Sequence, residues 1–360
     1  MIRVCQLYSP VAGYEAVRTA EQLCDNLGDG FDVMVRRSTS RSPWAALLTT
    51  LQHRRAAGFD IVHAWDAPSL AQAVTMSPRV VFTPPATGLK SAIRLARAVM
   101  AHADVQVVCP TATMHRLAVE RGIPLERCHL IRPGVEFARV NQRRDRSLRA
   151  ALGFEEQDVV LAAVGESTPQ ANHRLVVWVM SILRVLEPCY KALLWGRGPQ
   201  AEQIAHFARV MEDERVVCLA ERRLGQPIAY EAMLAAADIV LNTADGVVDT
   251  LPIATAMAAG LPIVSVATPT ASELLEDRHT ALMVPKAHPR LLSQRVLDLR
   301  TDVGLQWQIS DRARTEAFSY FAQSRMIDQY RSLYEQMAAG KAVVVEQSAP
   351  GAGARFHARV

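Results

Sequence analysis

Short apolar runs and helix-period segments alternate along almost the whole chain, and this alternation limits the fold more than any other feature. The candidate strands of the first half are Arg3–Leu7, Phe31–Arg36, Ile61–Ala64, Val80–Thr83, Val105–Cys109 and Cys128–Ile131. Between the first two, the stretch Gly13–Leu27 places Val17, Leu23 and Leu27 on one face of a helix. This alternation of strands and helices predicts right-handed βαβ units and a parallel sheet covered by helices on both faces.

The second half repeats the scheme. Its candidate strands are Val159–Val164, Lys191–Trp195, Val216–Leu219, Ile239–Leu241, Ile263–Val266 and Ala281–Val284. Its candidate helices are His173–Leu186, Pro199–Met211, Gln226–Ala237, Leu251–Ala259 and Pro289–Arg300, followed by Gly304–Glu316 and Phe321–Met337. The polar stretch 141–150 is predicted to link two domains, 1–140 and 151–315, and residues 338–360 are predicted to form a flexible tail.

Composition excludes several classes of function. Hydrophobic residues make up 50% and charged residues 21% of the 360 positions, and the net charge is only +4, which is too small to argue for nucleic acid. No apolar run of about 18 residues is free of charges, so at most peripheral membrane contact is expected. The start, Met1–Cys5, has no signal-peptide layout. The six scattered cysteines indicate free buried thiols in a reducing cytoplasm and no metal site.

Ligands of parallel sheets bind at the carboxyl ends of the strands, so the loops after strands are the candidate sites. Motifs in and near these loops occur in a characteristic order. They are Phe59-Asp60-Ile61-Val62-His63-Ala64, the run from Ala103-Asp104-Val105 to Ile131-Arg132-Pro133-Gly134-Val135-Glu136, Trp195-Gly196-Arg197-Gly198-Pro199, Ala236–Leu241 and Ala256–Val264. By these motifs, residues 1–337 resemble a GT-B glycosyltransferase of the retaining family 4 kind.

The resemblance implies an α/β fold with two Rossmann-like parallel-sheet domains facing across a cleft. Residues 1–140 would form the acceptor-side domain and 151–315 the donor-side domain, and 316–337 would contain a helix that packs back on the first domain. The implied activity is transfer of a sugar from a nucleotide-sugar donor to a glycan or lipid acceptor, without a metal or other cofactor.

The family holds the donor diphosphate with an Arg and a Lys in a pattern like "G-R-x-x-x-x-K". In the matching run, Gly165 is kept, but Glu166 stands at the Arg position and Ala171 at the Lys position. A transferring diphosphate needs fixed cations or N–H donors, and a carboxylate reverses the local field. His173 and Arg174 are close enough to lend charge from shifted positions.

The family also uses two Glu residues that contact the donor sugar and the ribose. Their positions correspond to Val247 and Thr255, of which Val247 has no side-chain hydrogen bond to offer and Thr255 has a single hydroxyl. A shifted alignment would recruit Asp245 or Asp249 instead.

In the first domain, the family's glycine pair is reduced to Gly13, and Tyr14 takes the second position, where its ring would intrude on a diphosphate. The turn Thr83–Gly88 has Pro85 at about the position of the usual His. His63, oriented by Asp66, is a catalytic candidate, and the alternative is a histidine whose ring is hydrogen-bonded by backbone at the end of a strand.

Other candidates have equally plain alternatives. Trp65 would stack on a sugar or simply pack, and Arg197 would meet a phosphate or stay an exposed turn residue. The run from Glu221 to Arg223 stands where the family places the base pocket, or is a solvated charge run. The stretch Leu89–Arg97 is either a basic amphipathic helix at an anionic surface or an ordinary surface helix.

Two hypotheses for the function follow. The chain either transfers a sugar from a nucleotide-sugar donor or is an inactive glycosyltransferase-like protein that binds a ligand or supports a protein partner. The residues that serve turns and packing persist, whereas those that would touch charge or sugar have changed.

Overall fold

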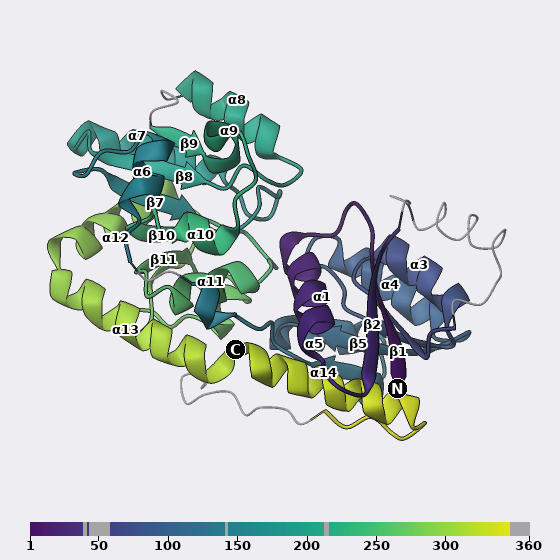
Figure 1. Cartoon of the computed structure of the whole chain (residues 1–360). Helices are drawn as coiled ribbons and strands as arrows, with labels where there is room; N and C mark the ends of the chain where they lie inside the picture. Colours follow the sequence, from purple (N-terminus) through teal and green to yellow (C-terminus); the bar gives the residue numbers. More distant parts are fainter. Residues whose placement is uncertain (39–41, 43–57, 141–142, 212–215, 346–360) are drawn as a thin grey trace. The chain divides into compact units, whose positions relative to one another are not determined.

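A computed structural model describes the chain except for residues 39–41, 43–57, 141–142, 212–215 and 346–360. The chain forms two compact units (Figure 1). Unit 1 contains Met1–Gly134 and the segment from Gln323 onward, and unit 2 contains Val135–Ala322. Each unit has one six-stranded parallel sheet, so the predicted α/β class with two Rossmann-like sheets is confirmed.

The sheet of unit 1 has the strand order β2-β1-β3-β4-β5-β6. Its strands are β1 Ile2–Tyr8, β2 Phe31–Arg37, β3 Ile61–Ala64, β4 Arg79–Phe82, β5 Asp104–Cys109 and β6 Cys128–Leu130. Its helices are α1 Tyr14–Asn26, α3 Ala67–Met76, α4 Leu89–Val99, α5 Ala112–Glu120 and α14 Gln323–Ala338. All four residues of β3 are buried, as expected for a strand covered on both faces.

The sheet of unit 2 has the order β12-β11-β10-β7-β8-β9. Its strands are β7 Val159–Ala163, β8 Tyr190–Leu194, β9 Val217–Leu219, β10 Ile239–Asn242, β11 Ile263–Val266 and β12 Leu282–Val284. Its helices are α6 Arg146–Leu152, α7 Arg174–Leu186, α8 Ala201–Met211, α9 Ala220–Leu224, α10 Tyr230–Leu234, α11 Leu251–Ala258, α12 Pro289–Thr301 and α13 Val303–Tyr320. All strands predicted from the sequence are present.

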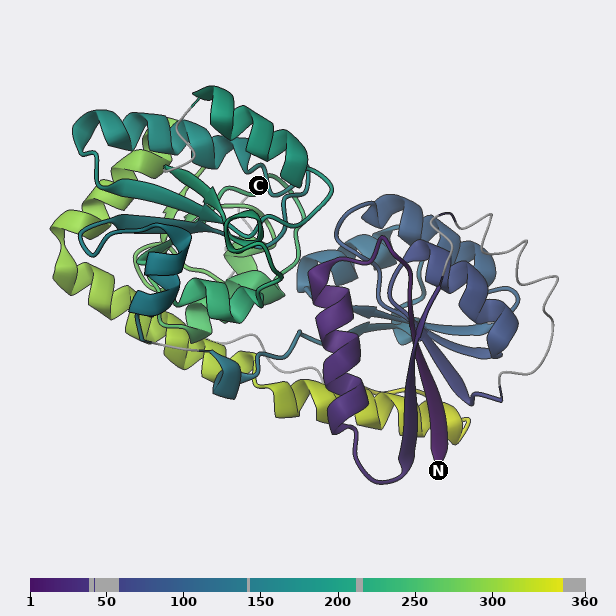
Figure 2. The same cartoon turned by 45° about the horizontal axis from the view of Figure 1, so that its top comes forward.

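The C-terminal helix α14 belongs to unit 1, where it contacts α1 and β3 (Figure 2). Met326, Tyr330, Leu333 and Met337 recur at helical spacing and enter the core of unit 1. The chain passes close to itself here, because a Cβ on Gly134 would lie 2.7 Å from the Gln323 Cα. Only glycine fits at that position.

The unit boundaries differ from the predicted domain boundaries. The chain leaves unit 1 after Gly134, and α6 already begins at Arg146, inside the stretch 141–150 predicted to be a linker. The Asp145 carboxylate starts α6 by accepting a hydrogen bond from the Leu148 amide at 3.0 Å. Residues 141–142 lie outside the described part of the chain.

The predicted flexible tail falls mostly outside the described residues, which end at Val345. Within the described part, Val343 and Val345 pack against the core of unit 1. Helix α13 also runs four residues past its predicted end, to Tyr320, where the chain is still in unit 2.

The predicted helix Gln226–Ala237 is wrong at both ends, because α10 spans only Tyr230–Leu234 and residues 226–229 and 235–237 lie outside it. Two side chains hold Ile228 out of the helix. The Trp195 indole donates to its carbonyl oxygen at 2.8 Å, and the Glu221 carboxylate accepts its amide at 3.1 Å. Pro227 disfavours helical backbone at Gln226, the residue before it.

Candidate functional site

The loops after β7, β8, β9 and β10 of unit 2 carry most of the residues predicted to contact a donor. Gly165, Glu166 and Ala171 follow β7, Arg197 follows β8, and Glu221 lies in α9 after β9. Val247 and Asp249 follow β10, and Thr255 lies in α11. Because parallel strands end at one edge of their sheet, these loops share that edge.

Two glycines shape the backbone of these loops. Gly198 has φ +105°, and a Cβ there would lie 2.7 Å from both the amide nitrogen and the carbonyl oxygen of Ser167. The Ser167 amide donates to the Arg197 carbonyl at 2.7 Å, and the Gln200 amide donates to the Ser167 carbonyl at 2.8 Å. Gly165 has φ +67° and faces Pro252 of α11. The main chain therefore fixes the loops after β7 and β8 to each other.

His173 is a structural residue of the loop after β7. Its Nε2 lies 3.0 Å from the Val164 carbonyl and its Nδ1 2.9 Å from the Ser167 hydroxyl. The side chain is buried, and burial lowers the pKa of its imidazole from 6.5 to about 4. The neighbouring Arg174 guanidinium stacks over the Phe207 ring, 5.2 Å from its centroid. The expectation that His173 supplies positive charge for a diphosphate is therefore wrong. The Arg174 side chain keeps its charge but is directed to the Phe207 ring.

Glu166 and Ala171 occupy the two positions of the expected diphosphate clamp. Glu166 is half-buried, and Ala171 is buried. The Ala171 carbonyl accepts a hydrogen bond from the Thr243 hydroxyl at 2.8 Å, and the Gln170 carbonyl accepts one from the Asp245 amide at 2.7 Å. These bonds fix the loop after β7 to the loop after β10 at the Ala171 position of the clamp.

Arg197 forms an ion pair with Glu221. Its Nε lies 2.6 Å from the carboxylate, and its guanidinium lies 4.8 Å from the centroid of the Trp195 ring. Glu221 also accepts the Ile228 amide, as described above. The sequence left Arg197 as a phosphate contact or an exposed turn residue, and Glu221 as part of the base pocket or of a solvated charge run. The structure shows that the two neutralise each other.

Thr255 cannot contact a ribose in this structure. Its side chain has no exposed surface, and its hydroxyl donates to the Leu251 carbonyl one turn earlier at 2.7 Å. All residues of α11 are buried. Val247 and Asp249, in the preceding loop, are half-buried, and Asp245 is exposed. The second position of the expected acidic pair is thus closed to a ligand.

In unit 1, Gly13 and Tyr14 lie at the start of α1. Gly13 is the residue before the helix, with extended backbone at φ −77° and ψ 171°, and Tyr14 is its first residue. Tyr14 is half-buried. Pro85 lies in the turn after β4, before Gly88, which adopts φ +76° at the start of α4.

His63, the catalytic candidate of unit 1, lies inside a buried chain of hydrogen bonds. The Trp65 indole donates to Gln6 Oε1 at 2.8 Å, and Gln6 Nε2 donates to the Tyr334 hydroxyl at 3.1 Å. That hydroxyl lies 2.7 Å from His63 Nδ1, and His63 Nε2 lies 2.9 Å from the Thr83 hydroxyl. The indole is only a donor, so Gln6 accepts through Oε1 and donates through Nε2, and both ring nitrogens of His63 have a hydroxyl partner.

This environment keeps His63 neutral. The ring has no exposed surface and stacks on Trp65 with their centroids 4.0 Å apart. Burial holds the pKa of His63 well below its usual value. The expectation that Asp66 orients His63 is wrong. Asp66 accepts the Ser69 amide at 2.8 Å at the start of α3, and the Ser9 amide at 2.7 Å.

The remaining sequence candidates have structural places. Leu89–Arg97 lies in α4, whose buried face includes Leu89, Ile93 and Ala96, while Lys90, Arg94 and Arg97 are exposed. All six cysteines are free, and Cys24 and Cys189 are half-buried rather than buried. No described helix is long and apolar enough to cross a membrane. Within the described ranges, no cluster of His, Cys, Asp or Glu is arranged to hold a metal ion.

The sequence motifs located the site residues but did not identify the side chains that form hydrogen bonds with them or with their loops. The Tyr334 hydroxyl and the Trp195 indole were not singled out, although both organise their loops. The one available signal was the aromatic spacing of Tyr330 and Tyr334 on the last helix, since two tyrosines one turn apart on a buried face need polar partners.

Two family models match the chain. The model described as "Glycosyltransferase Family 4" matches residues 18–139, and the model described as "Glycosyl transferases group 1" matches residues 158–302. One curated relative, N-acetyl-alpha-D-glucosaminyl L-malate synthase of Bacillus anthracis, is 23% identical over 202 residues, or 54% of this chain. That match spans only 50% of the relative's length.

Solved structures match over nearly the whole chain. Sucrose-phosphate synthase from Thermosynechococcus elongatus has a TM-score of 0.73 and 15% identity, with 95% of this chain and 100% of that chain covered. HepE from Anabaena, in complex with UDP-glucose, has a TM-score of 0.70 and 15% identity, with 94% and 99% covered. A glycosyltransferase from Rickettsia africae has a TM-score of 0.69 and 13% identity, with 93% and 98% covered.

Proposed function

The chain belongs to the GT-B glycosyltransferases of the family 4 kind, and on that premise we propose that it acts by binding a ligand or a partner rather than by ordinary sugar transfer. The observation that carries this proposal is the charge at the donor loops of unit 2. Glu166 is acidic at a clamp position, and Arg197, the cation of the next loop, is paired with Glu221.

Electrostatics opposes a diphosphate at these loops. Ala171 is uncharged, and His173 is neutral because it is buried. A carboxylate about 4 Å from a phosphate oxygen would cost roughly 4 kcal/mol at an effective dielectric of about 20, taken as an upper guide. A nucleotide-sugar donor would therefore meet an acidic side chain at a clamp position where transfer requires a cation or N–H donor to stabilise the leaving diphosphate.

Recognition of the donor's hydroxyl groups is weakened in the same way. The Thr255 side chain, on α11, is fully buried, and Val247 has an apolar side chain. Asp249 remains the candidate of the shifted alignment. Without the carboxylate pair, the ribose and sugar hydroxyls lack the acceptors that would fix them.

The alternative is an active transferase that uses relocated groups. One observation favours it, namely the backbone around Gly165 and Gly198, where positive φ angles and hydrogen bonds between the loops are in place. HepE, a protein of the same fold, has been solved with UDP-glucose. Under this alternative the chain would transfer a sugar to a glycan or lipid acceptor without a metal.

Titration of UDP, GDP and ADP into the full chain, followed by calorimetry, separates the two functions. A ligand that prefers the folded state must also raise the melting temperature. The proposal predicts no binding at sub-millimolar nucleotide. Sub-millimolar binding of any of the three, with a matching thermal shift, would contradict it.

Restoring the clamp provides the complementary test. The double variant Glu166→Arg with Ala171→Lys is expected to gain affinity for UDP, and Glu166→Gln serves as the control that removes the negative charge without adding a cation. A double variant that is folded, as judged by its melting curve, yet binds no better than Glu166→Gln would show that charge at these positions is not the main loss.

A further inference from the structure

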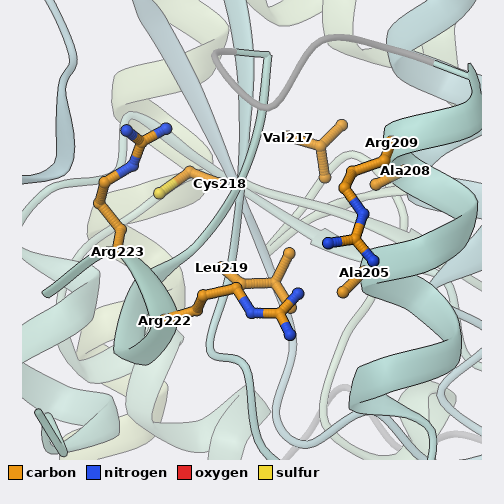
Figure 3. A pocket seen from close by; sticks show the side chains of 8 residues that line it. All are labelled: Ala205, Ala208, Arg209, Val217, Cys218, Leu219, Arg222 and Arg223. Atoms are coloured by element: carbon orange, nitrogen blue, oxygen red, sulfur yellow. The ribbon is translucent and has the colours of Figure 1, made fainter. Parts of the chain in front are cut away.

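A hollow of about 280 Å³ lies in unit 2 between α8, the edge strand β9 and α9 (Figure 3). We call it the arginine pocket. Its lining consists of Ala205, Ala208, Arg209, Val217, Cys218, Leu219, Arg222 and Arg223. These described lining residues include three arginines and no carboxylate.

The shape of the arginine pocket follows from the sequence of α8. Ala205, Ala208 and Arg209 are three and four residues apart, so they share the face of α8 that looks onto β9. Two alanines on this face leave room that larger side chains would fill. Val217 and Leu219 complete an apolar floor from β9, which has no strand beyond it. The volume is close to the lower limit for small-molecule pockets.

The guanidinium groups give the pocket its charge. Figure 3 shows those of Arg209 and Arg222 turned toward the same hollow beside Ala205, whereas Arg223 lies on the other side, beside Cys218. A planar guanidinium with several N–H donors matches the oxygens of a phosphate better than a lysine ammonium does. Two such groups over an apolar floor form a receptor for a compact oxyanion.

Glu202 shows that the Arg222 guanidinium accepts an oxyanion partner. Its two carboxylate oxygens lie 2.9 and 3.2 Å from Arg222 Nη2. The pair is exposed to solvent, with 83% of the Glu202 side chain accessible, so it contributes little stability. A more highly charged anion at Arg222 would displace this carboxylate.

Cys218 does not oppose an anion. Burial raises the pKa of its thiol to about 11, against the lowering effect of nearby Arg223. At neutral pH the thiol is therefore uncharged, and the charge of the lining is that of the arginines.

The arginine pocket shares two residues with the run Glu221–Arg223, which the sequence placed at the expected base pocket. In α9, Glu221 pairs with Arg197 of the donor loops, whereas the next two residues, Arg222 and Arg223, line the arginine pocket. The other lining residues come from α8 and β9 and were not predicted to contact a donor.

We propose that the arginine pocket is an anion-binding site that takes a phosphate monoester group, carried either by a soluble compound or by a lipid headgroup. Arg209 and Arg222 bind the phosphate oxygens, Arg223 adds to the attractive field, and the apolar floor receives the carbon skeleton next to the phosphate. Glu202 leaves Arg222 when the ligand enters.

The test uses the full chain and two probes at constant ionic strength. Sodium phosphate is titrated by calorimetry and thermal shift, and vesicles of phosphatidylcholine with or without phosphatidic acid are tested by co-sedimentation. Binding of either phosphate probe is expected. Phosphate alone would identify a soluble ligand, and phosphatidic acid vesicles alone would identify a headgroup. Binding of neither overturns the proposal.

Variants decide whether the arginine pocket is responsible. The double substitution Arg209→Gln with Arg222→Gln should weaken binding by roughly ten-fold or more. Arg290→Gln with Arg314→Gln removes the same charge from exposed positions of α12 and α13 and should change it less than about two-fold. If both double variants lose the same affinity for phosphate, the effect comes from net charge alone and the proposal is overturned.

Glu202 provides a gain-of-function test that a non-specific effect would not reproduce. Glu202→Gln removes the carboxylate from Arg222 and should strengthen phosphate binding several-fold. Asp311→Asn, at an exposed position of α13, makes the same change in net charge elsewhere and should have little effect. If Glu202→Gln binds phosphate no better than Asp311→Asn, Glu202 does not compete for the site and the proposal fails.

Discussion

Replacing Tyr334 with Phe removes one oxygen atom from the middle of the buried hydrogen-bond chain of unit 1 and leaves the packing of the ring. The hydroxyl lies 3.1 Å from Gln6 Nε2 and 2.7 Å from His63 Nδ1. Both partner side chains are fully buried, so water cannot replace the lost bonds. The substitution therefore leaves two buried polar atoms, Gln6 Nε2 and His63 Nδ1, without this partner.

The magnitude follows from these two groups. An unsatisfied buried polar group costs about 1–3 kcal/mol, and part of this is offset because the variant no longer buries the phenol oxygen. We expect the free energy of unfolding of unit 1 to fall by about 2–4 kcal/mol. For a unit of this size the melting temperature should fall by roughly 5–15 °C.

Calorimetric melting of the full chain, supported by urea unfolding, measures this loss. Tyr320→Phe makes the same chemical change at the half-buried end of α13, and its melting temperature should stay within about 2 °C of the wild type. If Tyr334→Phe melts no lower than Tyr320→Phe, the hydrogen-bond chain does not stabilise unit 1 and the structural role given to His63 is refuted.

Three further predictions concern unit 2. Gly198→Ala should destabilise it by at least about 2 kcal/mol in urea, because the new Cβ meets Ser167 at 2.7 Å with φ at +105°; a loss below about 1 kcal/mol, the cost of the strained φ alone, would contradict the close approach. The pKa of His173 is about 4 in the folded protein against 6.5 in the unfolded chain. The free energy of unfolding should therefore be unaffected by His173 above about pH 6.5 and should fall by up to about 3 kcal/mol as the pH falls toward about 4, because the unfolded state binds the proton first. If the urea midpoints of the wild type and of His173→Gln change in the same way across this range, this contribution of His173 is excluded. Glu221→Gln should raise the affinity for UDP in calorimetry by removing the partner of Arg197, and unchanged affinity would count against neutralisation by that pair.

The strands and most helices were predictable because their signals are local. A parallel strand buried on both faces is a short continuous apolar run, and β3, β10 and β11 show such runs. The helix expected at Gln226–Ala237 failed for a non-local reason. Trp195 and Glu221, distant in sequence, hold Ile228 in a non-helical conformation.

The sequence predicts which loops and helices hold the candidate site residues, but it does not predict which side chains these residues pair with. The motifs located Glu166, Arg197 and Thr255 in their loops and helix, yet the pairing of Arg197 with Glu221 joins residues from different strand–helix units. Likewise, no local pattern links His63 to Tyr334, which is 271 residues away. The burial of Thr255 was foreseeable, since α11 is apolar on all faces and such helices are buried.

Release of nucleoside diphosphate from UDP, GDP and ADP sugars is the most direct test of the central claim, that this chain keeps the glycosyltransferase fold without ordinary donor chemistry. The measurement uses the full chain, with simple glycosides and lipid vesicles offered as acceptors. We expect nucleoside diphosphate to be released no faster than in a blank without protein. Release in molar excess over the protein, from any of these donors, would contradict it.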